Sequence, residues 1–535
     1  MFQQLDNASV ATYQAPYQAP LVASLMLVLT LLQGSSFTLT LAVLSPFASS
    51  TLSSFVTLTW LGMYVIATLG LITAFGLNWM SWLVRYRLPL TCLVAGTLFS
   101  SAWSVDTNLT IERSVHLIGT TLIALYLGFS LPLIRILRVS AAVLSGLMLA
   151  SVLAALFYPA LGLESYEGQQ VWRGVMVSKN TLGFWSAVSI LLLLNLSSGN
   201  ESGYRRALYI CFAVVSAICL FKSVSATSAL ALLSASLVMI YLHIAFSLRL
   251  GLIAMIVLGL LVTAMMGMAF YYIDTAELIG RSGDLTGRGA VWQQTWALIL
   301  DRPLTGFGYG TIWYPTEQSV WIQQSLTDFS WIVYHAHNGL LQIASELGLP
   351  LTLLALIMIV QQLIEIVYCQ YQRQQPGVLF VLGFTVALLV SNYSEARLLI
   401  HRELYWVFFI ALPISMLQQV NVFASHTGFN PIPGKLAAHY SEKLRLSRVK
   451  QTERRKLKKR FRTHRKIAIV NAKTADQPSG SATSASQEAT STKPFVIDNA
   501  PANNSSATRQ IDSGASTARE LPLKRKMTRR KKKAG

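Results

Sequence analysis

The amino-acid sequence predicts an all-α polytopic integral membrane protein with about 12 transmembrane helices and one long extracytoplasmic loop. The chain has 535 residues, of which 53% are hydrophobic and 12% are charged, whereas soluble proteins carry about 25% charged residues. Apolar runs of membrane-spanning length recur from residue 21 to residue 420. These runs lack the alternation of barrel strands, and an open sheet cannot satisfy its backbone in lipid, so helices are expected.

Each predicted span rests on the thickness of the bilayer. About 20 apolar residues are needed, because the hydrocarbon core is about 30 Å thick and a helix rises about 1.5 Å per residue. The first run follows a polar segment without Lys or Arg and no small-residue cleavage pattern follows it, so we interpret it as a membrane helix and not as a signal peptide. For the three runs within 181–246, an alternative is that one of them is re-entrant and does not cross the membrane. The predicted spans are 21–44, 55–77, 86–103, 114–134, 139–157, 181–197, 207–221, 223–246, 250–272, 338–368, 377–393 and 404–420.

The short connections between spans predict the orientation. Positive residues favour the cytoplasmic side, and with the N-terminus inside, the even-numbered connections are cytoplasmic and carry eight arginines, which is a moderate bias. The opposite connections, at 45–54, 104–113, 158–180, near 222, 273–337 and 394–403, hold many acidic residues and nearly as many basic ones. We therefore expect both ends of the chain on the cytoplasmic side. The arginines predicted inside are Arg85, Arg87, Arg135, Arg138, Arg205, Arg206, Arg249 and Arg373.

The charge distribution divides the chain into a membrane domain and a tail. Residues 1–434 hold 17 Lys and Arg against 16 Asp and Glu, so nearly all of the net charge of +20 lies beyond them. We predict a cytoplasmic N-terminus (1–20), a membrane domain (21–420) with its long loop at 273–337, and a basic, largely disordered cytoplasmic tail (421–535). A basic run beside a membrane helix favours anionic inner-leaflet lipids as its partner, and nucleic acid is not expected.

Two cations precede the predicted span at 181–197. Arg173 and Lys179 lie just before it, and Asn180 and Thr181 are suited to cap its N-terminus. Cations beside a helix N-terminus form a good anion site. The alternative is that the two side chains only reach the membrane interface and fix the depth of the helix.

The predicted extracytoplasmic loop 273–337 carries a third cation, Arg288, ahead of a predicted surface helix at 290–300 with Trp292 and Trp296 on one face. A glycine-rich run, Gly306–Gly310, follows. It lacks a preceding strand and the lysine of a nucleotide-binding loop, so these are predicted to be turn glycines and not a phosphate loop.

The loop ends in His335, Ala336, His337 and Asn338, at the start of the span at 338–368. A histidine at a membrane boundary suits a general base or hydrogen-bond donor, and a structural cap is the alternative. His337 and Glu346 lack the spacing of a metalloprotease, and the four cysteines lie in or beside apolar runs, so no metal site and no cofactor are predicted.

Together, four segments resemble the O-antigen ligase and polysaccharide polymerase superfamily, including exopolysaccharide polymerases of the ExoQ kind. The resemblance spans about residues 20–420. One position departs from the ligase signature, because Leu351 stands where Gly, Thr or Tyr is usual, and the basic tail has no counterpart. The four segments are Ser101–Asp106 with Glu112 and Arg113; Arg173-Gly174 with Lys179, Asn180 and Gly183; Gly287-Arg288 with Trp292, Pro303, Gly306 and Gly308; and His335-Ala-His337-Asn338 with Gly348.

The resemblance implies a metal-independent glycosyltransferase that takes a glycan from undecaprenyl diphosphate outside the inner membrane and passes it to a hydroxyl acceptor. Arg173, Lys179 and Arg288 then bind the diphosphate, His337 and Arg288 are catalytic, and Asn338, Glu112 and Arg113 support the site. The expected acceptor is a growing glycan or the lipid A core, and polysaccharide assembly proteins are expected partners. The resemblance also implies a multi-pass protein of the bacterial inner membrane with an active site facing the periplasm.

Three functions remain open on the sequence alone. We favour polymerisation of exopolysaccharide or O-antigen units, because the Trp103–Asp106 segment and the outer loop are more like the exopolysaccharide members. Ligation to lipid A core or to a protein hydroxyl is the first alternative. A polysaccharide flippase is the second, although no internal repeat of the kind found in transporters is evident.

Overall fold

The fold is known from a computed structural model that describes much of the predicted membrane domain. The chain divides into two units, Met1–Gln451 and Thr452–Gly535, and every described residue belongs to the first. The predicted tail and the predicted span at 250–272 lie outside the described residues. These residues are 19–34, 49–166, 168–199, 201–248, 288–314, 316–317, 319–325, 333–373 and 376–419.

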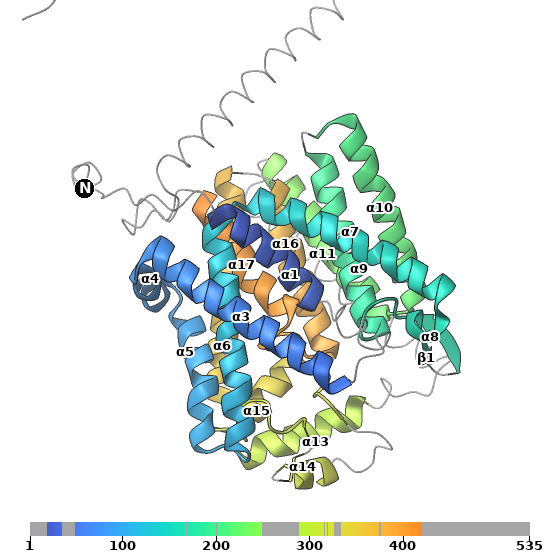
Figure 1. Cartoon of the computed structure of the whole chain (residues 1–535). Helices are drawn as coiled ribbons and strands as arrows, with labels where there is room; N and C mark the ends of the chain where they lie inside the picture. Colours follow the sequence, from blue (N-terminus) through green and yellow to red (C-terminus); the bar gives the residue numbers. More distant parts are fainter. Residues whose placement is uncertain are drawn as a thin grey trace, which may run out of the picture. The chain divides into compact units, whose positions relative to one another are not determined.

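The described part of the chain is almost entirely helical (Figure 1). Long helices alternate with short connections, as the apolar runs predict. The helices are α1 (Ala19–Gly34), α3 (Ser49–Phe75), α4 (Asn78–Tyr86), α5 (Leu88–Phe99), η1 (Ser100–Ala102), α6 (Thr107–Ser130), α7 (Leu133–Phe157), α8 (Pro159–Gly162), α9 (Lys179–Ser198), α10 (Gly203–Ser223), α11 (Ala226–Ser247), α13 (Arg288–Asp301), α14 (Val320–Ser325), α15 (Gly339–Arg373), α16 (Pro376–Ser394) and α17 (Leu404–Gln419), and the strands are β1 (Leu163–Tyr166) and β2 (Gln169–Trp172).

Within the described ranges, 7 helices are long and apolar enough to cross a membrane: α3, α7, α9, α10, α11, α15 and α16. Shorter apolar helices occupy Leu21–Gly34, Leu88–Ala102 and Leu404–Gln418, and α6 occupies most of the predicted span at 114–134. The chain is therefore a multi-pass helical protein, while the count of about 12 spans stays a prediction.

Several short elements were not predicted, among them helix α4 and the two strands. Helix α4 lies between two predicted spans and buries Trp79 and Trp82 on one side. Strands β1 and β2 form an antiparallel ladder from Leu163–Trp172 to Tyr166–Gln169, which corrects the all-α expectation for this connection. The reversal is possible because Gly168 has φ +75°, a left-handed conformation that glycine adopts without a Cβ clash.

Helix α9 lies at the centre of the packing. Of its apolar window 72% is buried, the largest share among the seven long helices, and α9 contacts α7, α10, α11 and α16. Its Phe184 and Trp185 meet the Tyr405 ring of α17 at centroid distances of 5.0 and 4.9 Å. The start of α9, which carries Lys179 and Asn180, is therefore held in a fixed place.

The connections predicted to be extracytoplasmic contact one another. The Trp103 indole donates to the Thr305 carbonyl at 2.9 Å, and the Tyr309 hydroxyl donates to the Leu399 carbonyl at 2.7 Å. Connections predicted to be cytoplasmic are likewise joined, as in the pair of Arg138 and Glu201. This grouping agrees with the two predicted sides of the membrane.

Candidate active site

The two histidines of the fourth segment lie in the turn that leads into α15. Asn338 caps the helix, since its Oδ1 accepts from the N–H groups of Leu340 at 3.0 Å and Leu341 at 3.1 Å. Its Nδ2 donates to the Tyr393 carbonyl at 3.2 Å. The turn places His337 at φ 49°, which is uncommon for a residue other than glycine. Asn338 therefore fixes the start of α15 and, with it, the histidine turn.

The backbone of His337 is held from both sides. Its N–H donates to Nδ1 of His335 at 3.2 Å, and the Trp292 indole of α13 donates to its carbonyl at 3.3 Å. The two imidazole rings lie 4.0 Å apart between centroids. Trp292 also meets the Tyr393 ring edge-on at 5.5 Å. The third and fourth segments of the resemblance thus meet at His337.

Glu395, in the connection after α16, completes this group. Its Oε2 lies 3.7 Å from Nε2 of His335, and its Oε1 accepts from Nδ2 of Asn180 at 2.8 Å. The Oδ1 of Asn180 in turn accepts from the Ser225 hydroxyl at 3.2 Å. We call His335, His337, Glu395 and Asn180 the histidine cluster. It links the second segment of the resemblance to the fourth.

The histidine cluster also offers metal ligands. One ligand atom each from His335, His337 and Glu395 lie within 4.8 Å of one another. The sequence predicts no metal site here, because the acid near His337 in the chain, Glu346, lacks metal-ligand spacing and Glu395 is 58 residues from His337. Two imidazoles and one carboxylate form a donor set that zinc accepts.

Arg173 and Lys179 lie beside the β-hairpin. The Nε of Arg173 donates to the Leu161 carbonyl at 2.9 Å, and the Lys179 ammonium lies 3.1 Å from the centroid of the Tyr166 ring. Lys179 is only 7% exposed. The next residue, Asn180, belongs to the histidine cluster through its hydrogen bond to Glu395. The second segment of the resemblance therefore reaches the site, although the Lys179 ammonium itself lies over the Tyr166 ring.

The N-cap of α9 differs from the prediction. Ser178, and not Asn180 or Thr181, caps the helix, and its hydroxyl accepts from the Thr181 N–H at 3.3 Å. The reason is that α9 begins at Lys179, two residues earlier than the predicted span. This frees the Asn180 amide for Glu395.

Arg288 is the first residue of α13, and its side chain lies outside the described part of the structure. It precedes Trp292 by four residues, about one helical turn. The predicted surface helix at 290–300 is thus confirmed as a helix that begins slightly earlier. Its buried face includes Val291 and Thr295, while Trp296 is half exposed.

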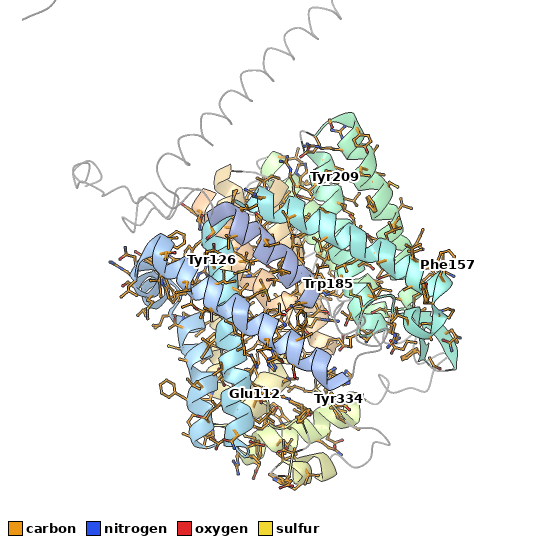
Figure 2. The ribbon with its side chains drawn as sticks, in the orientation of Figure 1. Glu112, Tyr126, Phe157, Trp185, Tyr209 and Tyr334 are labelled. Carbon is orange, nitrogen blue, oxygen red and sulfur yellow. The ribbon has the colours of Figure 1, made fainter. Side chains whose placement is uncertain are left out.

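Glu112 and Arg113 make their described contacts with α6 and with the glycine-rich turn. Arg113 donates to the Gly310 carbonyl at 2.6 Å and lies over the Tyr314 ring. Glu112 is on the exposed side of α6, labelled in Figure 2, and its carboxylate is 4.0 Å from the His116 ring. The structure therefore gives these two predicted supporting residues contacts with the glycine-rich turn and α6, and no contact with the histidine cluster is among those described.

The glycine-rich run is a set of turns, as predicted. Gly306 has φ +65°, and a Cβ there would lie 2.4 Å from the Glu346 backbone. Gly348 has φ +79° inside α15, where a Cβ would lie 2.4 Å from the Leu304 carbonyl oxygen. The turn at 303–308 thus packs directly on the kink of α15. Leu351, the position that departs from the ligase signature, packs near Gly96 of α5.

The connection 395–403 contains residues that the sequence reasoning missed. Arg397 is 5% exposed, lies over the rings of Phe184 and Tyr405, and reaches the Asn180 carbonyl at 3.5 Å. Desolvation raises the pKa of Glu403 to about 8, although Arg397 opposes the shift. A run of charged residues between two apolar spans was the available signal, since ionisable groups at such places are usually functional.

Comparison with known proteins gives two matches. The model of the O-Antigen ligase family matches residues 211–356, a stretch that includes Arg288, both histidines and Gly348. The exopolysaccharide production protein ExoQ of Rhizobium meliloti (strain 1021) is 23% identical over 353 residues, which cover 62% of this chain and 78% of the relative. Both matches agree with the resemblance drawn from the four segments.

Proposed function

Because this chain belongs to the O-antigen ligase and polysaccharide polymerase superfamily, we propose that it polymerises exopolysaccharide or O-antigen repeat units. The proposed donor is a glycan on undecaprenyl diphosphate, and the proposed acceptor is a hydroxyl of another glycan. The reaction takes place on the extracytoplasmic side of the bacterial inner membrane. The relative from Rhizobium meliloti is named for exopolysaccharide production, which favours polymerisation over ligation.

One observation carries this proposal. Segments far apart in the sequence converge on the turn before α15: Trp292 of α13 bonds the His337 carbonyl, and Asn180 of α9 bonds Glu395 beside His335. A site assembled from several elements and held by hydrogen bonds is preorganised, which is what electrostatic catalysis requires.

We propose that His337 acts as the general base. The acceptor hydroxyl gives its proton to the imidazole while its oxygen attacks the anomeric carbon of the donor sugar. A carbon–oxygen bond forms to the acceptor, and the bond from the sugar to the diphosphate breaks. The electron pair of that bond leaves with the undecaprenyl diphosphate.

The leaving diphosphate gains negative charge, and cations stabilise it. We propose that Arg173, Lys179 and Arg288 supply this charge in place of a metal ion. For Lys179 this requires the ammonium to leave the Tyr166 ring, and such a cation–π contact is worth only about 0.5–2 kcal/mol. Arg288 suits a diphosphate because a guanidinium offers paired donors in one plane.

The test is polymer formation by the full chain in proteoliposomes. The donor is an undecaprenyl-diphosphate-linked oligosaccharide, and the products are separated by size. A ladder that grows by whole repeat units supports a polymerase. A single transfer to added lipid A core indicates a ligase instead. Donor that stays intact with every acceptor tested contradicts the proposed transferase.

A further inference from the structure

We propose that His335, His337 and Glu395 form a Zn²⁺ site whose occupancy blocks glycan transfer. The inhibitory effect rests on the proposed function, since it assumes that transfer needs a His337 imidazole to which no metal ion is bound. The binding site itself rests only on the geometry of the three side chains.

The distances favour a shared ion over a direct hydrogen bond. Nε2 of His335 and Oε2 of Glu395 are 3.7 Å apart, beyond the usual limit of about 3.2 Å for a hydrogen bond of this kind. Two ligand atoms on a tetrahedral zinc ion lie about 3.3 Å apart, given bonds of about 2.0–2.1 Å. The three ligand atoms already lie within 4.8 Å of one another. A small movement of the side chains toward one another therefore brings these atoms to the spacing that zinc requires.

The chemistry of the ligands selects the metal. Imidazole suits zinc and other late transition ions, whereas Mg²⁺ and Ca²⁺ prefer oxygen ligands. Two histidines and one glutamate leave the fourth position of a tetrahedral ion open for water. A divalent transition ion is thus the expected ligand, and zinc is the representative we choose.

Hydrogen bonds around the group already orient the carboxylate. The Asn180 amide donates to Oε1 of Glu395 at 2.8 Å, which leaves Oε2 directed toward His335. Such outer hydrogen bonds hold metal ligands in place, and losing one costs about 10–100-fold in metal affinity. Asn180 is in turn held by Ser225.

One contact opposes binding and guides the choice of variant. Nδ1 of His335 accepts from the His337 N–H, but an imidazole bound to zinc through Nε2 carries its proton on Nδ1. Zinc binding through Nε2 of His335 must therefore break the hydrogen bond from the His337 N–H to Nδ1 of His335. His335→Asn is the informative substitution, because a carboxamide oxygen can still accept from the His337 N–H while the Nε2 ligand is lost.

The experiment uses the full chain, purified in detergent without a histidine tag and stripped with EDTA. Zn²⁺ binding is measured by calorimetry, and Co²⁺ is used as a probe whose visible absorption reports tetrahedral coordination. We expect the wild type to bind both ions and His335→Asn to bind Zn²⁺ at least about 10-fold more weakly. The matched control is His243→Asn, at an exposed histidine of α11, which should bind as the wild type does.

Transfer is then measured in the same proteins with increasing Zn²⁺. The proposal expects inhibition of the wild type and at least about 10-fold more Zn²⁺ for the same inhibition of His335→Asn. Equal zinc affinity in His335→Asn and His243→Asn overturns the site, whatever the activity. Zinc that binds at the histidines and stimulates transfer overturns the inhibition. A protein that binds zinc at this site but transfers no glycan even after zinc has been removed contradicts the proposed function alone.

Discussion

Asn180 and Glu395, 215 residues apart in the chain, are joined by a hydrogen bond of 2.8 Å between Nδ2 and Oε1. This bond ties the start of α9 to the connection after α16, beside the histidine turn. The Glu395 side chain is only 10% exposed, so a lost partner is not readily replaced by water. The bond therefore links the stability of the fold to the order of the site.

Replacing either partner should destabilise the protein. A hydrogen bond to a charged group contributes about 1.5–3 kcal/mol, so Asn180→Ala should lower the thermal midpoint of the detergent-solubilised protein. The double variant Asn180→Ala with Glu395→Ala should lose less than the two single losses combined, because both remove the same bond. Strict additivity of the two changes in a thermal-unfolding cycle would refute the coupling.

Stability should depend on pH through Glu403. Its pKa is raised from 4.5 to about 8, so the folded protein keeps this proton where the unfolded chain releases it. Stability from this group is complete below about pH 4.5 and is lost as the pH rises through about 8. Glu403→Gln should therefore flatten the fall in thermal midpoint between pH 5 and pH 8. An unchanged slope in this variant would show that Glu403 does not titrate as described.

The topology prediction concerns residues outside the described ranges. The positive residues in short connections place both ends of the chain inside. A single cysteine introduced at Asp328, in a background without the native cysteines, should react with an impermeant label added to intact cells. A cysteine at Lys450 should react only after the membrane is opened. If both positions report the same side, the number of spans differs by one.

The tail prediction also concerns undescribed residues. Because the basic tail follows the region of family resemblance, truncation after about residue 440 should leave glycan transfer largely intact. Its loss should instead reduce attachment to vesicles that contain anionic lipid, at about 1 kcal/mol per basic residue near the surface. A stably inserted truncated protein that has lost all turnover would show that the tail takes part in the reaction.

The helices could be predicted well because each depends on an apolar run of consecutive residues, which is visible in the sequence. An apolar run of span length is sufficient to identify α3, α7 or α16. Most described helices begin and end within a few residues of the predicted limits, but α3, α6 and α7 begin six or seven residues earlier. Helix α4 was missed because it is short and amphipathic, so it buries Trp79 and Trp82 without forming a long apolar run. The β-hairpin was missed because its pairing depends on a turn at Gly168 and not on composition.

The site was predicted only in part, because its residues come from different elements. Asn338 could be predicted to lie beside His337 because the two residues are adjacent in the sequence. The glycines of the run 306–310 could be predicted to form turns because the run lacks the pattern of a phosphate loop. Glu395 was missed because nothing in local spacing relates it to Asn180 or His335. Glu112 and Arg113 were assigned by resemblance, and the structure gives them contacts with His116 and Gly310 instead.

Glycan transfer in proteoliposomes by His337→Ala and Arg288→Ala proteins that insert normally tests the proposed roles of the histidine and the cations. We expect loss of the general base to lower turnover by about 10²-fold or more, and we expect Arg288→Ala or Arg173→Ala to nearly abolish polymer. Arg288→Lys should recover only part of the activity, since the paired donors are lost, and His335→Ala should matter less than His337→Ala. Wild-type activity should survive EDTA. Normal transfer by His337→Ala would rule out the histidine as the general base. Wild-type transfer that vanishes in EDTA and returns with a divalent metal would rule out cations acting in place of a metal ion.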